Sequence, residues 1–277
     1  MLKKLLNTTF LSVCFVCVTL AAPLVYAQET TSETSATTKT KKKEASAEQI
    51  QEWQNMALGY YNDEGRFFSK DYKKAMEYFK KAALHDDATS LYYLGNMYNE
   101  GYGVEQDEHN ARLLFKRASE LGHADAQMLL GVMLIMDGMI LRDIEKRDAL
   151  YAEAVQWLEK SAAQKNAEAL FWLGDMQRKG FGIEKNEEQG VKRILESSKA
   201  NNPNALAMEA AFYWQELAGV KKDLKRAHAL MYKSQLYGND QARLLLKEIE
   251  EEMNATQREE AKALAVEAQK KFRKQNK

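Results

Sequence analysis

The fold is decided by residues 93–123, which read YLGNMYNEGYGVEQDEHNARLLFKRASELGH. The stretch opens with a Leu-Gly pair, passes through the loop sequence Gly101-Tyr102-Gly103-Val104, and reaches Asp107 twelve residues after Gly95. Aspartate is a good helix N-cap, and apolar residues recur at helical spacing on both sides of the loop. The stretch therefore predicts two helices joined by a short turn.

The same pattern recurs along the chain with a period near 36 residues. Leu-Gly pairs stand at residues 58–59, 94–95, 130–131 and 173–174, and a fifth copy has Ala210-Ala211 at this place. A candidate N-cap follows each of these markers: Asp71, Asp107, Asp143, Asn186 and Asp223. Two small residues, seven apart, then mark each second helix: Ala75 and Ala82, Ala111 and Ala118, Ala154 and Ser161, Gly190 and Ser197, Ala227 and Ser234. Such a period predicts an all-α solenoid, in which small residues let paired helices approach closely.

These residues resemble the Sel1-like repeat family, a relative of the tetratricopeptide repeat. The resemblance rests on the Leu-Gly pair, the Gly-x-Gly-Val segment, the Asp cap and the Ala-bearing second helix, and it extends over residues 50–239. It implies a right-handed α-solenoid of helix-turn-helix repeats, in a secreted bacterial member with a scaffold or adaptor role. The sequence departs from the family pattern at three places, which puts the regularity of the curvature in doubt: Ala211 replaces the marker glycine, Gly65-Arg66-Phe67-Phe68 stands in the loop of the first repeat, and Gly190 replaces the usual alanine.

The first 46 residues precede the repeats. Lys3 and Lys4 stand before an apolar run at residues 11–20, and small residues precede a cut after Ala27. This pattern is typical of a signal peptide at residues 1–27, and the alternative is an anchor that stays in place. Residues 28–46 are rich in Ser and Thr and have no large apolar side chain, so we expect a disordered linker.

The rest of the chain divides into two parts. Residues 47–239 are predicted to form five repeats, and residues 240–277 two capping helices with a basic tail. Thr256 and Glu259 have the spacing of a capping box for the last helix. Repeat three has seven surplus residues before Ala154, which predict a longer second helix that serves either as a docking knob or as a neutral insertion.

Composition and cysteine usage limit the function and the location. The chain has 40 basic and 40 acidic side chains, which argues against nucleic-acid binding. Both cysteines, Cys14 and Cys17, lie in the predicted signal peptide, so the mature chain would have no disulfide and no thiolate. We expect an exported protein with no stable membrane span after cleavage, located in a bacterial periplasm, with secretion as the alternative.

The resemblance also implies a binding surface. In the related tetratricopeptide geometry, the first helix of each repeat lines a concave groove, and positions around the marker glycine point inward. Carried over to this sequence, these positions give twelve candidate partner-binding residues: Trp53, Met56, Tyr60, Tyr92, Asn96, Met128, Val132, Phe171, Asp175, Arg178, Met208 and Phe212. Aromatic and Met side chains suit adaptable recognition of a peptide or partner helix. The alternative is that many of them pack between repeats.

Catalytic patterns are sparse. The four histidines, at 85, 109, 123 and 228, have no metal-pair spacing, and there is no His-Glu-x-x-His or Gly-x-Ser-x-Gly string. We therefore expect no enzyme, no cofactor and no metal, but an adaptor for a peptide segment or protein partner. The alternatives are an envelope hydrolase acting on cell-wall or β-lactam compounds, and a secreted host-interaction factor. The sequence leaves the oligomeric state open.

Overall fold

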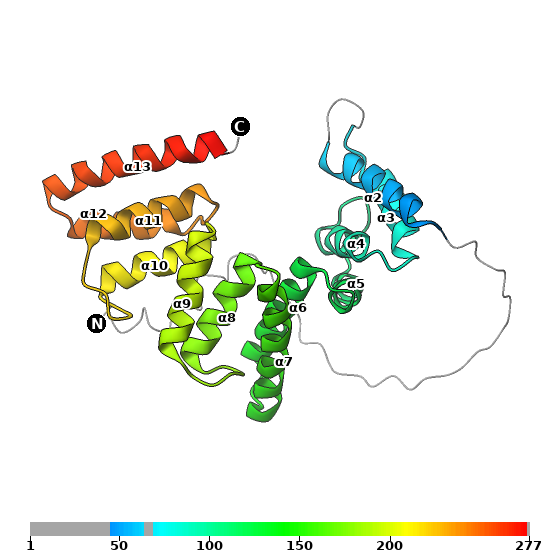
Figure 1. Ribbon diagram of the computed structural model, residues 1–277, viewed down its shortest axis with the longest axis horizontal. Helices are drawn as coiled ribbons and strands as arrows, with labels where there is room; N and C mark the ends of the chain where they lie inside the picture. Colours follow the sequence, from blue (N-terminus) through cyan, green and yellow to red (C-terminus); the bar gives the residue numbers. More distant parts are fainter. Residues whose placement is uncertain (1–44, 64–68, 276–277) are drawn as a thin grey trace. The chain divides into compact units, whose positions relative to one another are not determined.

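The computed structural model describes residues 45–63 and 69–275, and this part contains twelve helices and no strand (Figure 1). The predicted signal peptide and nearly all of the predicted linker lie outside the described residues. The helices are α2 (Ala47–Asn62), α3 (Tyr72–Ala83), α4 (Ala88–Glu100), α5 (Glu108–Glu120), α6 (Ala124–Ile140), α7 (Ile144–Ala163), α8 (Ala167–Lys179), α9 (Glu187–Lys199), α10 (Pro203–Gln215), α11 (Leu224–Leu236), α12 (Ala242–Glu252) and α13 (Ala255–Gln275).

The first ten of these helices form five consecutive pairs, α2/α3 to α10/α11. The second helix of each of the first four pairs also packs against the first helix of the next pair, as α3 does against α4 and α9 against α10. The first helix α8 also contacts the first helices on either side of it, α6 and α10. The predicted α-solenoid of helix-turn-helix repeats is thereby confirmed.

The predicted N-caps of the second helices are confirmed. Asp71, Asp107, Asp143, Asn186 and Asp223 each accept a hydrogen bond from the backbone N–H three residues later. In Asp107 this bond, from Asn110, lowers the pKa of the carboxyl group below its ordinary value. The N-cap residue therefore fixes the point at which each second helix begins.

The marker glycines lie where the paired helices come closest. A Cβ atom on Gly95 would stand 2.6 Å from the ring of Phe115, and one on Gly131 would stand 2.8 Å from Leu158. On Gly174 it would stand 2.7 Å from the carbonyl oxygen of Gly190. Any side chain at these positions would push the helices of a pair apart.

In repeats three to five, the second of the two small residues of the second helix forms a hydrogen bond to the first helix of the same repeat. There it is a serine whose hydroxyl donates across the pair to the start of the first helix. Ser161 Oγ donates to the carbonyl of Ala124 at 2.7 Å, Ser197 to Ala167 at 2.6 Å, and Ser234 to Pro203 at 2.7 Å. Ala82 and Ala118 hold this position in repeats one and two. Three of the five pairs therefore have a hydrogen bond from this position to the start of the first helix.

Repeat three extends in both of its helices. Its second helix, α7, has 20 residues and is helical from Ile144, as predicted, but α6 also has 17 residues where the other first helices of repeats two to five have 13. Gly138 explains the second extension, because a Cβ there would lie 2.5 Å from the ring of Tyr151. A second glycine thus continues the close contact for two further turns.

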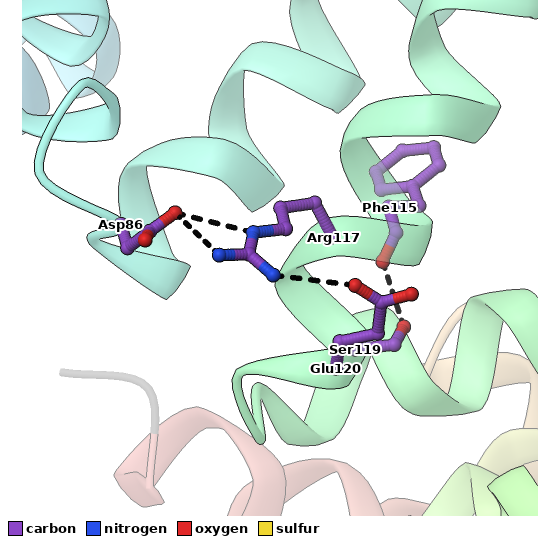
Figure 2. A network of polar contacts seen from close by, with 5 residues as sticks. All are labelled: Asp86, Phe115, Arg117, Ser119 and Glu120. Atoms are coloured by element: carbon purple, nitrogen blue, oxygen red, sulfur yellow. Dashed lines mark hydrogen bonds and ion pairs between the residues drawn. The ribbon is translucent and has the colours of Figure 1, made fainter.

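A turn between repeats is held by the ion pairs that Figure 2 shows. Arg117 of α5 lies 2.9 Å from Asp86, in the turn between α3 and α4, and 3.4 Å from Glu120 of its own helix. All three side chains are more than 40% exposed, so this network contributes little to stability.

The C-terminal helices pack against the last repeat, since α11 contacts both α12 and α13. The predicted capping box of Thr256 and Glu259 is wrong. The N–H of Gln257 donates to Asn254 Oδ1, and the N–H of Asn254 donates to Gln257 Oε1. The same reciprocal geometry is therefore formed two residues earlier, by an Asn and a Gln.

Adding one methyl group at the closest helix crossing tests this packing. We expect Gly174→Ala to lower the free energy of unfolding by about 1–3 kcal/mol, because the new Cβ meets the backbone of α9. Lys192→Ala on the exposed side of α9 should change it by less than about 0.5 kcal/mol. Urea unfolding followed by circular dichroism measures both. Equal stability of Gly174→Ala and wild type would contradict the close crossing.

The serine links give a second stability prediction. We expect Ser197→Ala to lower the free energy of unfolding by about 1 kcal/mol, since it removes a hydrogen bond between two helices. Ser119 is equally buried, but its hydroxyl donates to Phe115 within its own helix, so Ser119→Ala should cost less. The difference between the two variants in the same unfolding measurement gives the contribution of the hydrogen bond between the paired helices.

Candidate functional site

The twelve predicted partner-binding residues lie on the five first helices, α2, α4, α6, α8 and α10, and we call them the inner row. Their burial divides the inner row into two sections. The seven residues on α2, α4 and α6 are all half-buried: Trp53, Met56, Tyr60, Tyr92, Asn96, Met128 and Val132. On α8 and α10, Phe171, Asp175, Met208 and Phe212 are buried, and Arg178 is half-buried.

The aromatic residues of the first section each stack on one neighbour. Trp53 lies 5.9 Å from the ring of His85, Tyr60 lies 6.1 Å from Tyr78, and Tyr92 lies 4.4 Å from His123. In each case the partner belongs to the second helix of the same repeat or to the turn that follows it. These contacts fix the rings and leave part of their surface accessible, so this section can offer rigid apolar area to a partner.

Neighbouring tyrosines serve a different purpose, which the sequence interpretation missed. Tyr61 and Tyr93 follow Tyr60 and Tyr92, and a step of one residue turns a side chain to another face of the helix. Their rings lie 5.2 Å apart in the core of the first repeats. Burial among other tyrosines raises the pKa of Tyr61 to about 12. The two Tyr-Tyr doublets in the sequence could have indicated this, because only one tyrosine of each doublet can lie on the inner row and the other turns to the core.

The second section is closed by contacts between α8 and α10. The guanidinium carbon of Arg178 lies 5.3 Å from the centroid of the Phe212 ring, and Nη1 lies 3.9 Å from Sδ of Met208. Asp175 accepts a hydrogen bond from Lys179 Nζ at 2.5 Å. Lys179 was absent from the predicted site, although its spacing of four residues from Asp175 on one helix is a signal for such a pair. Phe212 is thus buried in a contact between repeats.

The departure at Gly190 has a local explanation. A Cβ atom on Gly190 would lie 2.5 Å from Cγ of Arg178 and 2.5 Å from the carbonyl oxygen of Gly174. The usual alanine would thus collide with the aliphatic part of the arginine. The exchange of alanine for glycine therefore makes room for one side chain of the inner row.

A polar cluster beside the inner row joins repeats four and five. Glu168 accepts hydrogen bonds from Nε1 of Trp172 at 2.8 Å, from Nδ2 of Asn204 at 3.2 Å and from Nδ2 of Asn202. Asn202 also caps α10 with its side-chain oxygen. Three donors of the protein thus hold this carboxylate between repeats four and five.

The described residues provide no metal site, since no three His, Cys, Asp or Glu side chains are grouped suitably in them. Two of their histidines have structural surroundings: His123 caps α6, and His228 lies 2.9 Å from Glu250 between α11 and α12. None of the helices within residues 45–63 and 69–275 has the length and apolar character that crossing a membrane requires.

His123 is a titratable residue in contact with the inner row. Its Nδ1 accepts a hydrogen bond from the N–H of Ala126 at 3.3 Å, which requires the nitrogen to be unprotonated. Burial lowers the pKa of His123 below 6.5, and the nearby Asp125 and Asp87 offset part of this effect. The same ring stacks on Tyr92, so protonation would disturb both the cap and an inner-row contact.

A chain of paired helices in which each pair packs on the next is an α-solenoid repeat protein. The Sel1 repeat family model matches five segments, residues 55–87, 88–123, 124–166, 167–192 and 204–234. Together these segments exceed half of the chain, so the protein belongs to the Sel1 repeat family, as the resemblance implied. Proteins of this family generally act as protein-interaction scaffolds.

Individual proteins are similar to parts of the chain. A sel1-like repeat-containing protein of Acanthamoeba polyphaga mimivirus is 31% identical over 75 residues, which cover 27% of this chain but only 14% of the viral protein. The crystal structure of a Sel1 repeat protein from Oxalobacter formigenes has a TM-score of 0.60 at 22% identity, and covers 79% of this chain and 88% of that one. The immunity protein Pa5087 from Pseudomonas aeruginosa has a TM-score of 0.45 at 17% identity, with 79% and 83% covered.

The buried histidine predicts a pH dependence of stability. Because the pKa of folded His123 is lowered, its contribution to stability is present above pH 6.5 and is lost as the pH falls through the folded value. We expect the melting temperature to fall less between pH 7.5 and 5.5 in His123→Asn than in wild type, since Asn caps a helix without titrating. Thermal unfolding at both pH values measures the difference, and identical decreases would contradict the assignment.

Proposed function

We propose that this protein is a non-catalytic adaptor that holds a peptide segment or protein partner against the inner row. The half-buried section on α2, α4 and α6 carries this proposal. It presents three aromatic rings and two methionines on successive first helices, and each ring is held by a stacking neighbour. Rigid aromatics bind with little loss of side-chain entropy, and Met side chains adapt to the shape of the partner.

The proposed location is an envelope compartment, with the periplasm as the first choice and secretion as the alternative. The support is the sequence of residues 1–27, with two lysines, an apolar run and small residues before the cut. A protein of this kind would bring one envelope component to another without altering either. Cell fractionation of the tagged full chain, with N-terminal sequencing of the product, tests both cleavage after Ala27 and retention.

Site-specific crosslinking tests the binding surface. A photoreactive amino acid in place of Tyr92 should crosslink the partner in cells, because Tyr92 lies in the half-buried section. The matched control is Trp157, another half-buried aromatic residue, which lies on the second helix α7. Mass spectrometry of the crosslinked bands identifies the partner. Equal crosslinking from both positions, or from Trp157 alone, would reject the inner row as the binding surface.

The affinities of variants in which one side chain is shortened to Ala give a second test of the same site. Met128→Ala and Tyr92→Ala, tested against the partner identified by crosslinking, should each weaken binding by about tenfold, as expected for truncation of an interface anchor. Trp157→Ala should leave the affinity unchanged. Circular dichroism confirms that each variant is folded. Unchanged affinity in both folded inner-row variants would contradict the proposed function.

A further inference from the structure

The last helix, α13, ends in a stretch that carries positive charge only. Residues 268–275 read AQKKFRKQ and contain no Asp or Glu. Their four cations, Lys270, Lys271, Arg273 and Lys274, all have exposed side chains, and we call them the cationic end of α13. The whole chain has a formal net charge of zero, so the cationic end is a local concentration of charge in a chain that is neutral overall.

The first half of α13 has its charges paired within the protein. Glu260 lies 2.6 Å from Lys225 of α11, and this ion pair joins the two helices. Glu259 lies 2.8 Å from Lys262, one turn further along α13. Both lysines therefore have a carboxylate as their partner, and this half of the helix presents no surplus positive charge from its lysines.

The second half of α13 differs, because its cations outnumber its carboxylates. Lys271 lies 2.7 Å from Glu267, which is the last acidic residue of the helix. Lys270, Arg273 and Lys274 form no ion pair with another described residue. Three positive charges at this end of α13 are therefore compensated only by solvent and its ions.

Contacts with α11 hold the cationic end in a fixed orientation. Ala261 and Ala265 are buried on one side of α13, and α13 packs against α11. Further along the same side, the ring of Phe272 lies 5.0 Å from the ring of Tyr237, the C-cap residue of α11. The helix is thus attached to the last repeat up to its final turn, and its opposite side faces away from the repeats.

That opposite side combines charge with a small apolar area. Ala263, Val266, Lys270 and Lys274 are all exposed and follow one another at spacings of three or four residues, which places them on one face of the helix. Val266 is 51% exposed. From residue 263 to residue 274 this face extends for about 16 Å along the helix axis. It is long enough to contact several lipid headgroups at the same time.

The helix dipole explains only part of this arrangement. Cations near the C-terminus of a helix are stabilising, but the effect falls off within the last turn. Arg273 and Lys274 lie in the last turn of α13, whereas Lys270 and Lys271 precede it. Two of the four cations are therefore not accounted for by the dipole.

We propose that the cationic end of α13 binds the surface of a bilayer that contains anionic phospholipids. This inference goes beyond the proposed function, because it involves neither the inner row nor its partner. Several Lys and Arg side chains on one helix face are attracted by the negative surface potential of such a bilayer, and each adds to the binding. Long exposed side chains without fixed partners suit headgroups that move in the plane of the membrane. An acidic polypeptide is the competing partner, and the experiment distinguishes the two.

Vesicle sedimentation tests the proposal with the full chain as cells process it. One set of vesicles contains phosphatidylglycerol and phosphatidylcholine in equal amounts, and the other contains phosphatidylcholine alone. We expect binding to the anionic vesicles to be about tenfold tighter than binding to the neutral vesicles. This preference should decrease between about 50 and about 500 mM NaCl, because salt screens exposed charges. Equal binding to both sets of vesicles would overturn the proposal.

A triple variant assigns the binding to the cationic end. Replacing Lys270, Arg273 and Lys274 by Gln removes the three cations without a carboxylate partner. We expect this variant to bind anionic vesicles at least about tenfold more weakly than wild type. These side chains are exposed, so circular dichroism should show the same helix content in both proteins. Wild-type binding by the folded triple variant would assign the attraction to another part of the chain and overturn the inference.

The matched control removes the same charge from a different surface. Lys185, Lys192 and Lys199 lie on α9 or in the loop before it, and their side chains are exposed. Replacing these three lysines by Gln should leave binding to anionic vesicles at the wild-type level. An equal loss of binding in the control would show that only the total charge matters, and would overturn the assignment to α13.

A soluble Glu-rich peptide distinguishes the competing partner. If the peptide binds wild type but not the triple variant, and anionic vesicles bind neither, then the cationic end recognises an acidic polypeptide and the lipid proposal is wrong. The adaptor function is tested separately, since crosslinking from Tyr92 does not involve α13. Vesicle binding without crosslinking from Tyr92 would therefore support this inference and contradict the proposed function.

Discussion

The structure depends on the close approach of the two helices in each pair. At Gly95, Gly131 and Gly174 there is no space for a methyl group, and the atoms that fill the space belong to the partner helix. A short separation is possible only where a small residue faces the partner helix at a fixed position, which is why the repeat is visible in the sequence. The sequence therefore repeats because the same close contact between helices recurs in each repeat. In repeats three to five, the serine hydrogen bonds add to this contact.

The constraint also divides the surface of the first helices. One side of each first helix must face its own second helix, so the remaining side either meets the neighbouring first helices or stays open. In α8 and α10 the inner-row side chains fill the contact between the two helices. In α2, α4 and α6 the same positions stay half-buried. Identical places in the repeat therefore serve packing in one part of the chain and remain accessible in another.

Sequence analysis predicted the features that depend on local chemistry. The five N-caps of the second helices follow from residues within a few positions of each other. It was wrong about the last capping box, where two adjacent Asn/Gln and Thr/Glu pairs competed. It also missed the extension of α6. In that case the deciding contact, Gly138 against Tyr151, joins residues in different helices.

The inner row could likewise be predicted only in part from the sequence: the positions of its residues could be predicted, but not their burial. The spacing around the marker glycine selected its residues, but their burial depends on what the next repeat brings. For Phe212 that neighbour is Arg178, 34 residues earlier in the sequence, so no local pattern predicts the contact. Similarly, the reason for Gly190 became visible only with the path of the arginine side chain.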